Sequence, residues 1–161
     1  IVCKGLRERR ELGPVIQASS SGISFKATIK TPTCARFKPT VTFNNKPESV
    51  VGGSASSVSL KIVNNNSFAC PLATMNITVQ APSAEWLTNA SQGSVAVASG
   101  DAAYPSSPFQ VPSTAAAGVY TITYTVRETT SGLTATLPMQ VTVVERPTIT
   151  SIEPAFIRRA G

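Results

Sequence analysis

The chain has 161 residues, a net charge of +6 and an isoelectric point of about 9.6, and 42% of its residues are hydrophobic. This hydrophobic content is ordinary for a globular protein and excludes a chain that is disordered throughout. No stretch approaches the roughly 18 consecutive apolar residues of a membrane span, so we expect no direct membrane insertion.

The excess positive charge is concentrated near one end. Residues 1–46 carry nine Lys and Arg side chains against two Glu, whereas the remaining residues are nearly balanced. A basic domain of this kind suggests nucleic-acid binding. The sequence has no zinc-finger, homeodomain or RRM signature, and its aromatic residues fall on predicted core faces. We therefore interpret residues 1–46 as a solvated basic segment and expect no nucleic-acid partner.

The first 39 residues are predicted to lead into a domain. Residues 1–14 are typical of a connector, in which the Arg7–Arg10 cluster is either a processing or heparin-type site or an exposed charged loop, and we favour the loop. Alternation over residues 23–30 predicts a half-buried strand, either the last of a preceding domain or an edge strand of this one. Prolines make residues 31–39 a stiff, extended linker.

From Thr40 onward the sequence predicts short strands separated by turns rich in Ser, Thr, Gly and Pro. The first strand is expected over residues 40–43. Trp86 is expected to fill one end of the core, and Pro138 to mark an edge or bulge because it has no backbone donor. Alternation predicts the inward positions Val58, Leu60, Ile62, Met75, Ile77, Val79, Val95, Val97, Phe109, Val111, Leu133, Ala135, Leu137, Met139, Val141 and Val143.

The clearest strand covers Gly118 to Val126, where Tyr120, Ile122, Tyr124 and Val126 alternate with Val119 and three threonines. The run from Ala116 to Ile122 resembles the tyrosine corner of immunoglobulin-like sandwiches. The resemblance implies that the Tyr120 hydroxyl bonds to a backbone group a few residues upstream. Ile122 stands at the cysteine position of that motif, which excludes the antibody-type core disulfide.

We therefore predict an all-β fold, an immunoglobulin-like β-sandwich of about seven strands flanked by pieces of neighbouring domains. The predicted division is the end of a preceding domain and a linker over residues 1–32, the sandwich over 33–146, and the first strand of another domain over 147–161.

Three further parts of the sequence resemble known families. Residues 33–144 resemble the NPCBM-associated modules of secreted glycosidases in the Asn pair after the second strand, in the Ala-Pro-Ser-x-x-Trp run ending at Trp86, and in the Ala-Ala-Ala-Gly-Val-Tyr run ending at Tyr120. Pro147, Ile149, Ile152 and Pro154 resemble the opening strand of an IPT/TIG repeat. The segments around Cys34 and Cys70 resemble modules of algal cell-wall metallopeptidases and of large algal flagellar surface glycoproteins.

Three cysteines are present. Cys34 precedes the first sandwich strand and Cys70 lies in the loop after the second, positions that a sandwich can bring to the same end. We expect a Cys34–Cys70 disulfide, and the alternative is two free thiols in a cytosolic domain. Cys3 would then pair with a residue outside the sequence.

Three sequons for N-glycosylation are present, at Asn65, Asn76 and Asn89. Two are expected in loops and Asn76 on an outward strand face, and we favour modification at Asn76 and Asn65. Together with the cysteines, these sequons favour the secretory pathway and an extracellular or cell-surface location.

The chemistry of most enzymes is missing from the sequence. The chain has no His, which excludes Ser-His-Asp and Cys-His catalysis and His-ligated metal sites. Its single Asp and seven Glu are scattered, so neither a glycosidase carboxylate pair nor a calcium site is indicated. We expect no enzyme activity, no catalytic or metal-binding residues, and no cofactor.

These observations favour a non-catalytic structural or adhesive module of a large extracellular glycoprotein, acting as a spacer or assembly unit. Its expected partners are neighbouring immunoglobulin-like domains of the same chain, together with other copies or surface glycoproteins. The alternative is an accessory module of a secreted glycosidase or cell-wall metallopeptidase that contacts polysaccharide. A third hypothesis, an intracellular immunoglobulin-like domain of a transcription regulator, is disfavoured by the sequons and cysteines.

Overall fold

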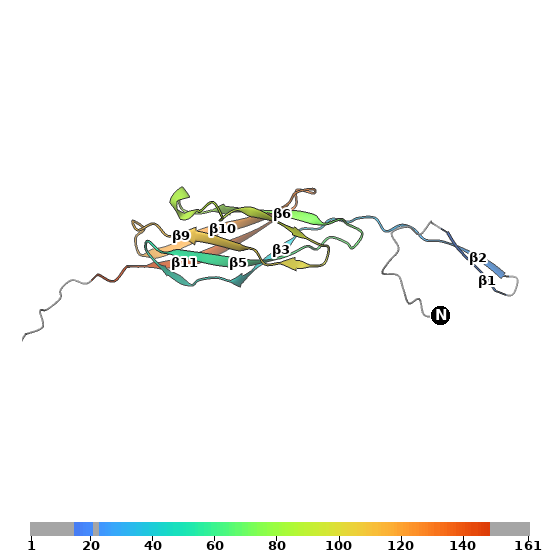
Figure 1. The fold of residues 1–161 in the computed structure, drawn as a ribbon, viewed down its shortest axis with the longest axis horizontal. Helices are drawn as coiled ribbons and strands as arrows, with labels where there is room; N and C mark the ends of the chain where they lie inside the picture. The colour runs from blue at the N-terminus through green and yellow to red at the C-terminus, as the bar shows by residue number, and fades with distance from the viewer. Residues whose placement is uncertain (1–14, 21–22, 149–161) are drawn as a thin grey trace, which may run out of the picture.

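A computed structural model describes residues 15–20 and 23–148, and the side chains from Ile29 onward. β1 (Val15–Ser20) and β2 (Ile23–Thr28) pair with each other as a separate antiparallel two-stranded sheet. An extended segment then joins them to a β-sandwich (Figure 1). The predicted connector, Cys3 and the residues expected to open an IPT/TIG repeat from Ile149 onward lie outside the described residues.

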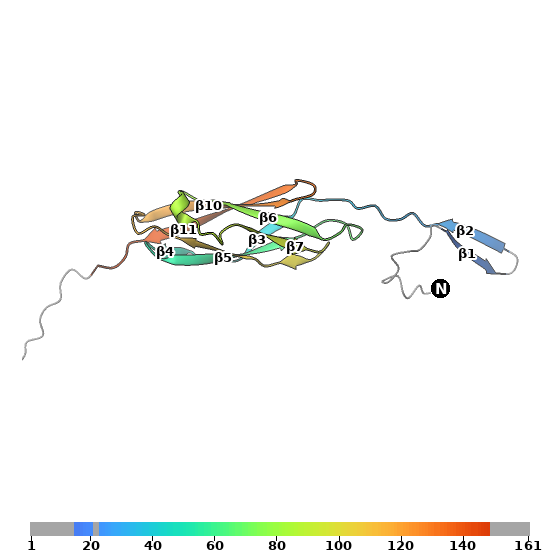
Figure 2. The same cartoon turned by 45° about the horizontal axis from the view of Figure 1, so that its top comes forward.

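The sandwich consists of two sheets that face each other (Figures 1 and 2). The larger sheet has the strand order β4-β11-β10-β6-β7, with the bounds β4 (Ser49–Val51), β11 (Thr134–Val144), β10 (Gly118–Glu128), β6 (Ala73–Gln80) and β7 (Gly93–Val97). In the smaller sheet β5 pairs with its three neighbours, with the bounds β5 (Ala55–Val63), β3 (Thr40–Asn45), β8 (Ala102–Ala103) and β9 (Ser106–Gln110).

The fold is an all-β immunoglobulin-like sandwich, as the sequence predicts, but it has nine strands where about seven were expected. The additional strands include β4 and β8, which have three and two residues and are too short to show alternation. The described residues contain one short 3₁₀ turn, η1 (Ala84–Trp86), and no helix with the length and apolar character needed to cross a membrane.

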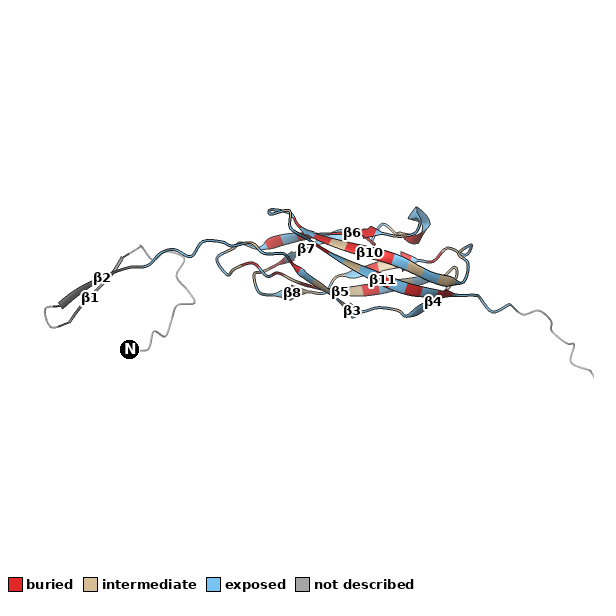
Figure 3. Ribbon diagram, turned by 180° about the vertical axis from the view of Figure 1, so that it is seen from behind, coloured by how far each residue is buried: buried red, intermediate tan, exposed pale blue. Residues whose placement is uncertain are grey.

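The core lies between the two sheets, where side chains of alternate residues meet. On β6 the buried and exposed positions alternate without a break, as the period of a strand requires (Figure 3). The inward positions of β5 and β10 are buried in the same way, and Trp86 is only 2% exposed. Leu133 differs from its prediction, because β11 begins at Thr134 and Leu133 lies exposed in the turn before it.

Pro138 occupies the position that its missing donor allows. β11 is paired with β4 only over Thr142–Val144, so no strand among the described residues pairs with the outer edge of β11 at Pro138. The predicted edge position is confirmed.

One linker reaches each end of the sandwich, and we call these ends the N-terminal pole and the C-terminal pole. The N-terminal pole comprises residues 34–39, the loop 64–72 and the turn 129–133. The C-terminal pole comprises the turn at Gly52 and Gly53, the loop 112–117 and residues 144–148.

Candidate functional site at the two poles

The linker that leads into the sandwich is fastened to it covalently. Cys34 and Cys70 form a disulfide with their Cα atoms 4.5 Å apart and a sequence separation of 36. Cys34 precedes β3, and Cys70 lies in the loop between β5 and β6. The bond therefore closes a loop that contains β3, β4 and β5, and the Cys34–Cys70 bridge expected from the sequence is present.

Hydrogen bonds from the backbone and side chains of the loop 64–72 hold the linker next to the disulfide. The amide of Ser67 donates to the carbonyl oxygen of Ala35 at 2.9 Å, and the amide of Ala35 donates to Ser67 Oγ at 2.9 Å. Further along, the amide of Phe37 donates to Asn66 Oδ1 at 2.8 Å. Residues 35–37 are thus held by the loop 64–72 as well as by the sulfur bridge.

The loop 64–72, which contacts the linker, is itself held in place by the side chain of Asn64. Asn64 is fully buried, and its Oδ1 accepts the amide proton of Asn66 at 3.0 Å, a local turn that asparagine favours. Asn64 Nδ2 donates to the carbonyl oxygen of Val97 on β7 at 2.9 Å. The Nδ2 of Asn66 is buried without a hydrogen-bond partner. A chain of polar contacts therefore runs from β7 through Asn64 and Asn66 to the linker.

The amide of Asn65 reaches the linker as well. Asn65 Nδ2 donates to the carbonyl oxygen of Lys38 and to Thr40 Oγ1, both at 2.8 Å. This nitrogen is the atom that N-glycosylation would modify. Of the other two sequon asparagines, Asn76 lies exposed on β6 and Asn89 lies exposed after η1. Asn65 therefore differs from Asn76 and Asn89, because its side-chain amide forms hydrogen bonds that hold the linker.

A partly buried ion pair joins the linker to the opposite side of the same pole. Arg36 Nη1 lies 2.8 Å from Glu128 Oε1, and the Glu128 side chain is fully buried whereas that of Arg36 is 22% exposed. The amides of Ser131 and Thr130 donate to Glu128 Oε2 and Oε1 at 2.7 and 3.3 Å. A buried carboxylate needs such partners, because desolvation without them is costly.

These partners decide the protonation state of Glu128. Burial alone raises the pKa of the carboxyl group, but the hydrogen bonds from Ser131 and Thr130 and the charge of Arg36 outweigh it and lower the pKa below its ordinary value. Glu128 is therefore charged at neutral pH. Its carboxylate joins the linker at Arg36 to the end of β10.

Exposed apolar side chains also lie at the N-terminal pole. Phe68 is 91% exposed, and Phe37, Leu72 and Leu133 are exposed as well. Phe68 lies over the turn at Gly100, where a Cβ atom would stand 3.0 Å from the Phe68 ring. Among the aromatic side chains, Trp86 is buried, whereas Phe37 and Tyr104 are exposed.

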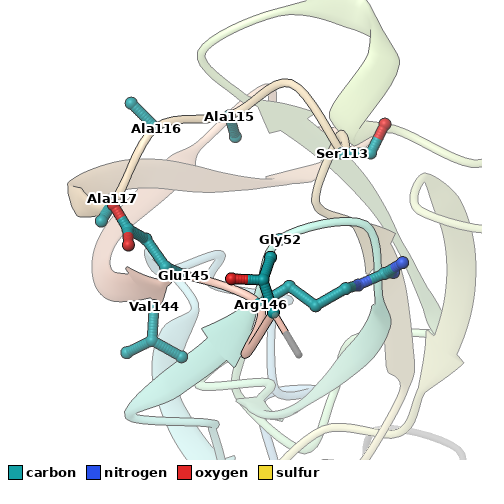
Figure 4. Close-up of a pocket in the computed structure, with 9 residues that line it drawn as sticks. Gly52, Ser113, Ala115, Ala116, Ala117, Val144, Glu145 and Arg146 are labelled. Carbon is teal, nitrogen blue, oxygen red and sulfur yellow. The ribbon is translucent and has the colours of Figure 1, made fainter. Parts of the chain in front are cut away.

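The C-terminal pole holds a groove of about 410 Å³ where the chain leaves β11 (Figure 4). Small side chains and backbone form most of its lining, together with Glu145 and Arg146. The amide of Gly52 donates to the carbonyl oxygen of Val144 at 3.2 Å. A Cβ atom on Gly53, whose φ is 82°, would stand 2.9 Å from Arg146 Nη2. The groove is thus formed around the departing chain.

The tyrosine corner lies next to this pole. The Tyr120 hydroxyl donates to the carbonyl oxygen of Ala116 at 2.9 Å, which is the kind of bond that the resemblance implies. The ring is half-buried and packs against Trp86, with ring centroids 5.0 Å apart. The contact links η1 to the start of β10.

Sequence reasoning missed the role of Glu128. Its position continues the alternation of Ile122, Tyr124 and Val126, so the period of β10 places it on the inward face. The alternation is therefore the signal of its burial, whereas the scattered spacing of the acids along the chain gives none. Across the described residues no group of three or more His, Cys, Asp or Glu side chains could hold a metal ion.

Fold and attachments together define an immunoglobulin-like sandwich whose linkers are held at opposite ends. No protein-family model matches the chain, and no curated protein sequence matches it.

Solved structures with a similar fold come from several bacteria. A FixG-related protein from Vibrio parahaemolyticus is 12% identical, with 70% of this chain and 98% of that chain covered and a TM-score of 0.47. Native alpha-2-macroglobulin from Escherichia coli, from domain MG7 to the C-terminus, is 19% identical, with 70% and 17% covered and a TM-score of 0.49. Domains 4 and 5 of the S-layer protein SbsC are 16% identical, with 81% and 63% covered and a TM-score of 0.40. Nothing about function follows from likeness at this level, and the resemblances to NPCBM-associated and IPT/TIG modules stay predictions.

Proposed function

We propose that this chain is a non-catalytic structural module of a large extracellular or cell-surface glycoprotein, in which the sandwich acts as a stiff spacer or assembly unit. Its partners would be the neighbouring domains of the same chain and other copies or surface glycoproteins. The observation that carries the proposal is the attachment of the linker at the N-terminal pole.

A spacer has to fix the direction in which the chain enters and leaves. A flexible linker would leave that direction free, since each unfixed residue keeps several backbone conformations. Here residues 34–40 are held by a disulfide, a partly buried ion pair and several hydrogen bonds to the sandwich. The disulfide alone would be enough to close a loop. The additional ion pair and hydrogen bonds therefore support a fixed joint between the linker and the sandwich.

The departing chain is guided at the other pole. β4 pairs in parallel with the last residues of β11, and Gly52 bonds to Val144. Arg146 then lies close to Gly53. The described chain thus enters at one pole and leaves at the other, which suits a unit placed in line with its neighbours (Figure 2).

Two further observations support the structural and extracellular parts of the proposal. Among the described residues, Glu128 is the charged side chain that the fold buries. It forms an ion pair with Arg36 and accepts hydrogen bonds from two backbone amides. A carboxylate held in this way suits structural use. Disulfides persist in oxidising compartments, and the exposed sequons at Asn76 and Asn89 suit the same location.

The test measures backbone order along the joint in the whole chain. We expect ¹⁵N relaxation to give residues 35–38 order parameters near those of β10, on the order of 0.85, and to give lower values after reduction of the disulfide. A Cys3→Ser variant serves as the control for the third thiol and should behave as the parent does. Order parameters below about 0.6 with the disulfide intact would contradict a fixed joint.

The accessory-module alternative is supported by the exposed aromatic side chains Phe37, Phe68 and Tyr104. Exposed aromatic faces are a common means of contacting sugars. Binding of the whole chain to a polysaccharide at physiological salt, lost in Phe68→Ala or Tyr104→Ala but kept in Val119→Ala, would favour this alternative. Hydrolytic turnover by the chain would overturn the non-catalytic proposal.

A further inference from the structure

The disulfide changes which strands can separate when the two ends of the chain are pulled. Cys34 lies upstream of β3, and its bond leads directly to Cys70, just before β6. β3, β4 and β5 are therefore enclosed in a covalent loop. Separation of β3 from β5 cannot lengthen the chain while this bond is intact, because the distance between Cys34 and Cys70 stays fixed.

We propose that the Cys34–Cys70 disulfide transfers tension from the β3–β5 ladder to β6, so that the module resists extension through its larger sheet. The inference deepens the proposed function, because a spacer between domains is pulled at its two ends. The strands that must slide before the chain can extend are then β6, β10 and β11.

The arrangement of these three strands suits resistance to tension. β6 and β11 both pair antiparallel with β10 and are therefore parallel to each other. β6 begins at the N-terminal pole, and β11 ends at the C-terminal pole. Tension at these two ends pulls β6 and β11 in opposite directions along β10. The ladder bonds are perpendicular to the strands, so this motion loads many of them together and not one at a time.

The larger sheet also provides the longer ladders. β10 is paired with β11 over Gly118–Arg127 and with β6 over Thr123–Glu128. β3 is paired with β5 alone, from Thr40 to Asn45, and its register shifts after Phe43. Without the disulfide, tension would enter through this short strand. With the disulfide, the longer ladders on β10 must shear first.

The ion pair of Arg36 and Glu128 is a second tie between the linker and β10, but it is not covalent. Rupture of this ion pair leaves the covalent connection through Cys34 and Cys70 intact. A variant that removes it, Glu128→Gln, therefore separates the contribution of the disulfide from that of the other attachments.

The experiment is single-molecule extension of the 161-residue chain held at its two ends through ligated, cysteine-free attachments. The same chain is measured oxidised and after reduction. The enclosed loop of 36 residues has a contour length of about 12 nm, so we expect oxidised molecules to extend by about 12 nm less when they unfold. We also expect them to unfold more slowly than reduced molecules at the same force.

Three variants make the result specific. The double variant Cys34→Ser/Cys70→Ser should reproduce the reduced chain under oxidising conditions. Cys3→Ser should leave both quantities unchanged, and Glu128→Gln should keep the 12 nm difference between oxidised and reduced molecules.

Equal extensions in the two redox states would overturn the enclosed loop. A shorter extension without slower unfolding would overturn the transfer of resistance to β6, β10 and β11. Neither result depends on sugar binding or turnover, so failure of the proposed function in those assays would be distinguishable from failure of this inference.

Discussion

Arg36 and Glu128 are 92 positions apart in the chain, yet Nη1 of the first lies 2.8 Å from Oε1 of the second. The pair connects the incoming linker with the end of the strand around which the larger sheet is built. Because Glu128 is buried and Arg36 is partly exposed, loss of the carboxylate leaves an arginine that can turn to solvent.

We expect Glu128→Gln to lower the free energy of unfolding by about 1 to 3 kcal/mol, since a buried charged hydrogen-bond group is lost while one acceptor oxygen remains. Urea unfolding followed by the fluorescence of Trp86, the single tryptophan, would measure this. The matched control is Glu85→Gln, an exposed acid whose substitution should change stability by less than about 0.5 kcal/mol. Equal effects of the two variants would contradict the structural role of Glu128.

The free energy of unfolding should also depend on pH in the acidic range, because of Glu128. The pKa of Glu128 in the folded protein is lowered from 4.5, so its contribution is present above that value and is lost as the pH falls through the folded pKa. We expect the unfolding free energy of the parent to fall more steeply below about pH 4.5 than that of Glu128→Gln. Parallel pH profiles for the two proteins would rule out this linkage.

Two tyrosines on β10 should respond in opposite ways to loss of the hydroxyl. The Tyr120 hydroxyl donates to Ala116, so Tyr120→Phe should cost about 0.5 to 1.5 kcal/mol. The Tyr124 hydroxyl is buried without a hydrogen-bond partner, and burial raises its pKa to about 12, offset in part by Ser107. The Ser107 hydroxyl donates to the carbonyl oxygen of Ser91 and forms no hydrogen bond with the Tyr124 hydroxyl. Tyr124→Phe should therefore leave stability unchanged or raise it, and a loss above about 1 kcal/mol would show a hidden partner for Tyr124.

Two glycines provide a second matched pair, at the C-terminal pole and on β7. Gly53 has a φ of 82°, and a Cβ atom there would approach Arg146 and Ser113, whereas a Cβ atom on Gly93 meets nothing within 4 Å. We expect Gly53→Ala to cost about 1 to 2 kcal/mol and Gly93→Ala to be neutral or stabilising. Thermal or urea unfolding would compare them, and a tolerated Gly53→Ala would mean that the turn can rearrange.

Glycosylation should distinguish the three sequons. In a secreting eukaryotic host we expect Asn76 and Asn89 to carry glycans. The sequence alone favours Asn76 and Asn65, but we now expect Asn65 to be modified least, because its amide nitrogen bonds to Lys38 and Thr40. Mass spectrometry of chymotryptic peptides would measure occupancy at each site, because cleavage after Phe68 and Trp86 separates the three sequons, with Asn76→Gln as the control. Full occupancy at Asn65 in a folded product would show that these two bonds are dispensable.

The sequence predicted the strands that are long enough to repeat their pattern. β5, β6, β10 and β11 alternate over eight or more residues, so their inward faces could be read directly. β4 and β8 could not be predicted in this way, because a strand of two or three residues has no period and forms only where a partner offers its edge.

The joint at the N-terminal pole was only partly predictable. The disulfide followed from the places of Cys34 and Cys70 relative to the expected strands. The asparagines at 64–66 indicated a turn, but their bonds to the linker depend on how residues distant in sequence meet in space. Long-range polar contacts of this kind leave no local pattern in a single sequence.

Pro138 and β4 have a consequence for how copies of this module would meet. An exposed strand edge with free donors invites pairing with another molecule. On β11 the last residues are covered by β4, and the edge nearer its start carries a proline that cannot donate. Side-by-side joining of sheets is therefore hindered along this edge. Modules crowded together on a surface would therefore not fuse through the β11 edge into a continuous β-structure.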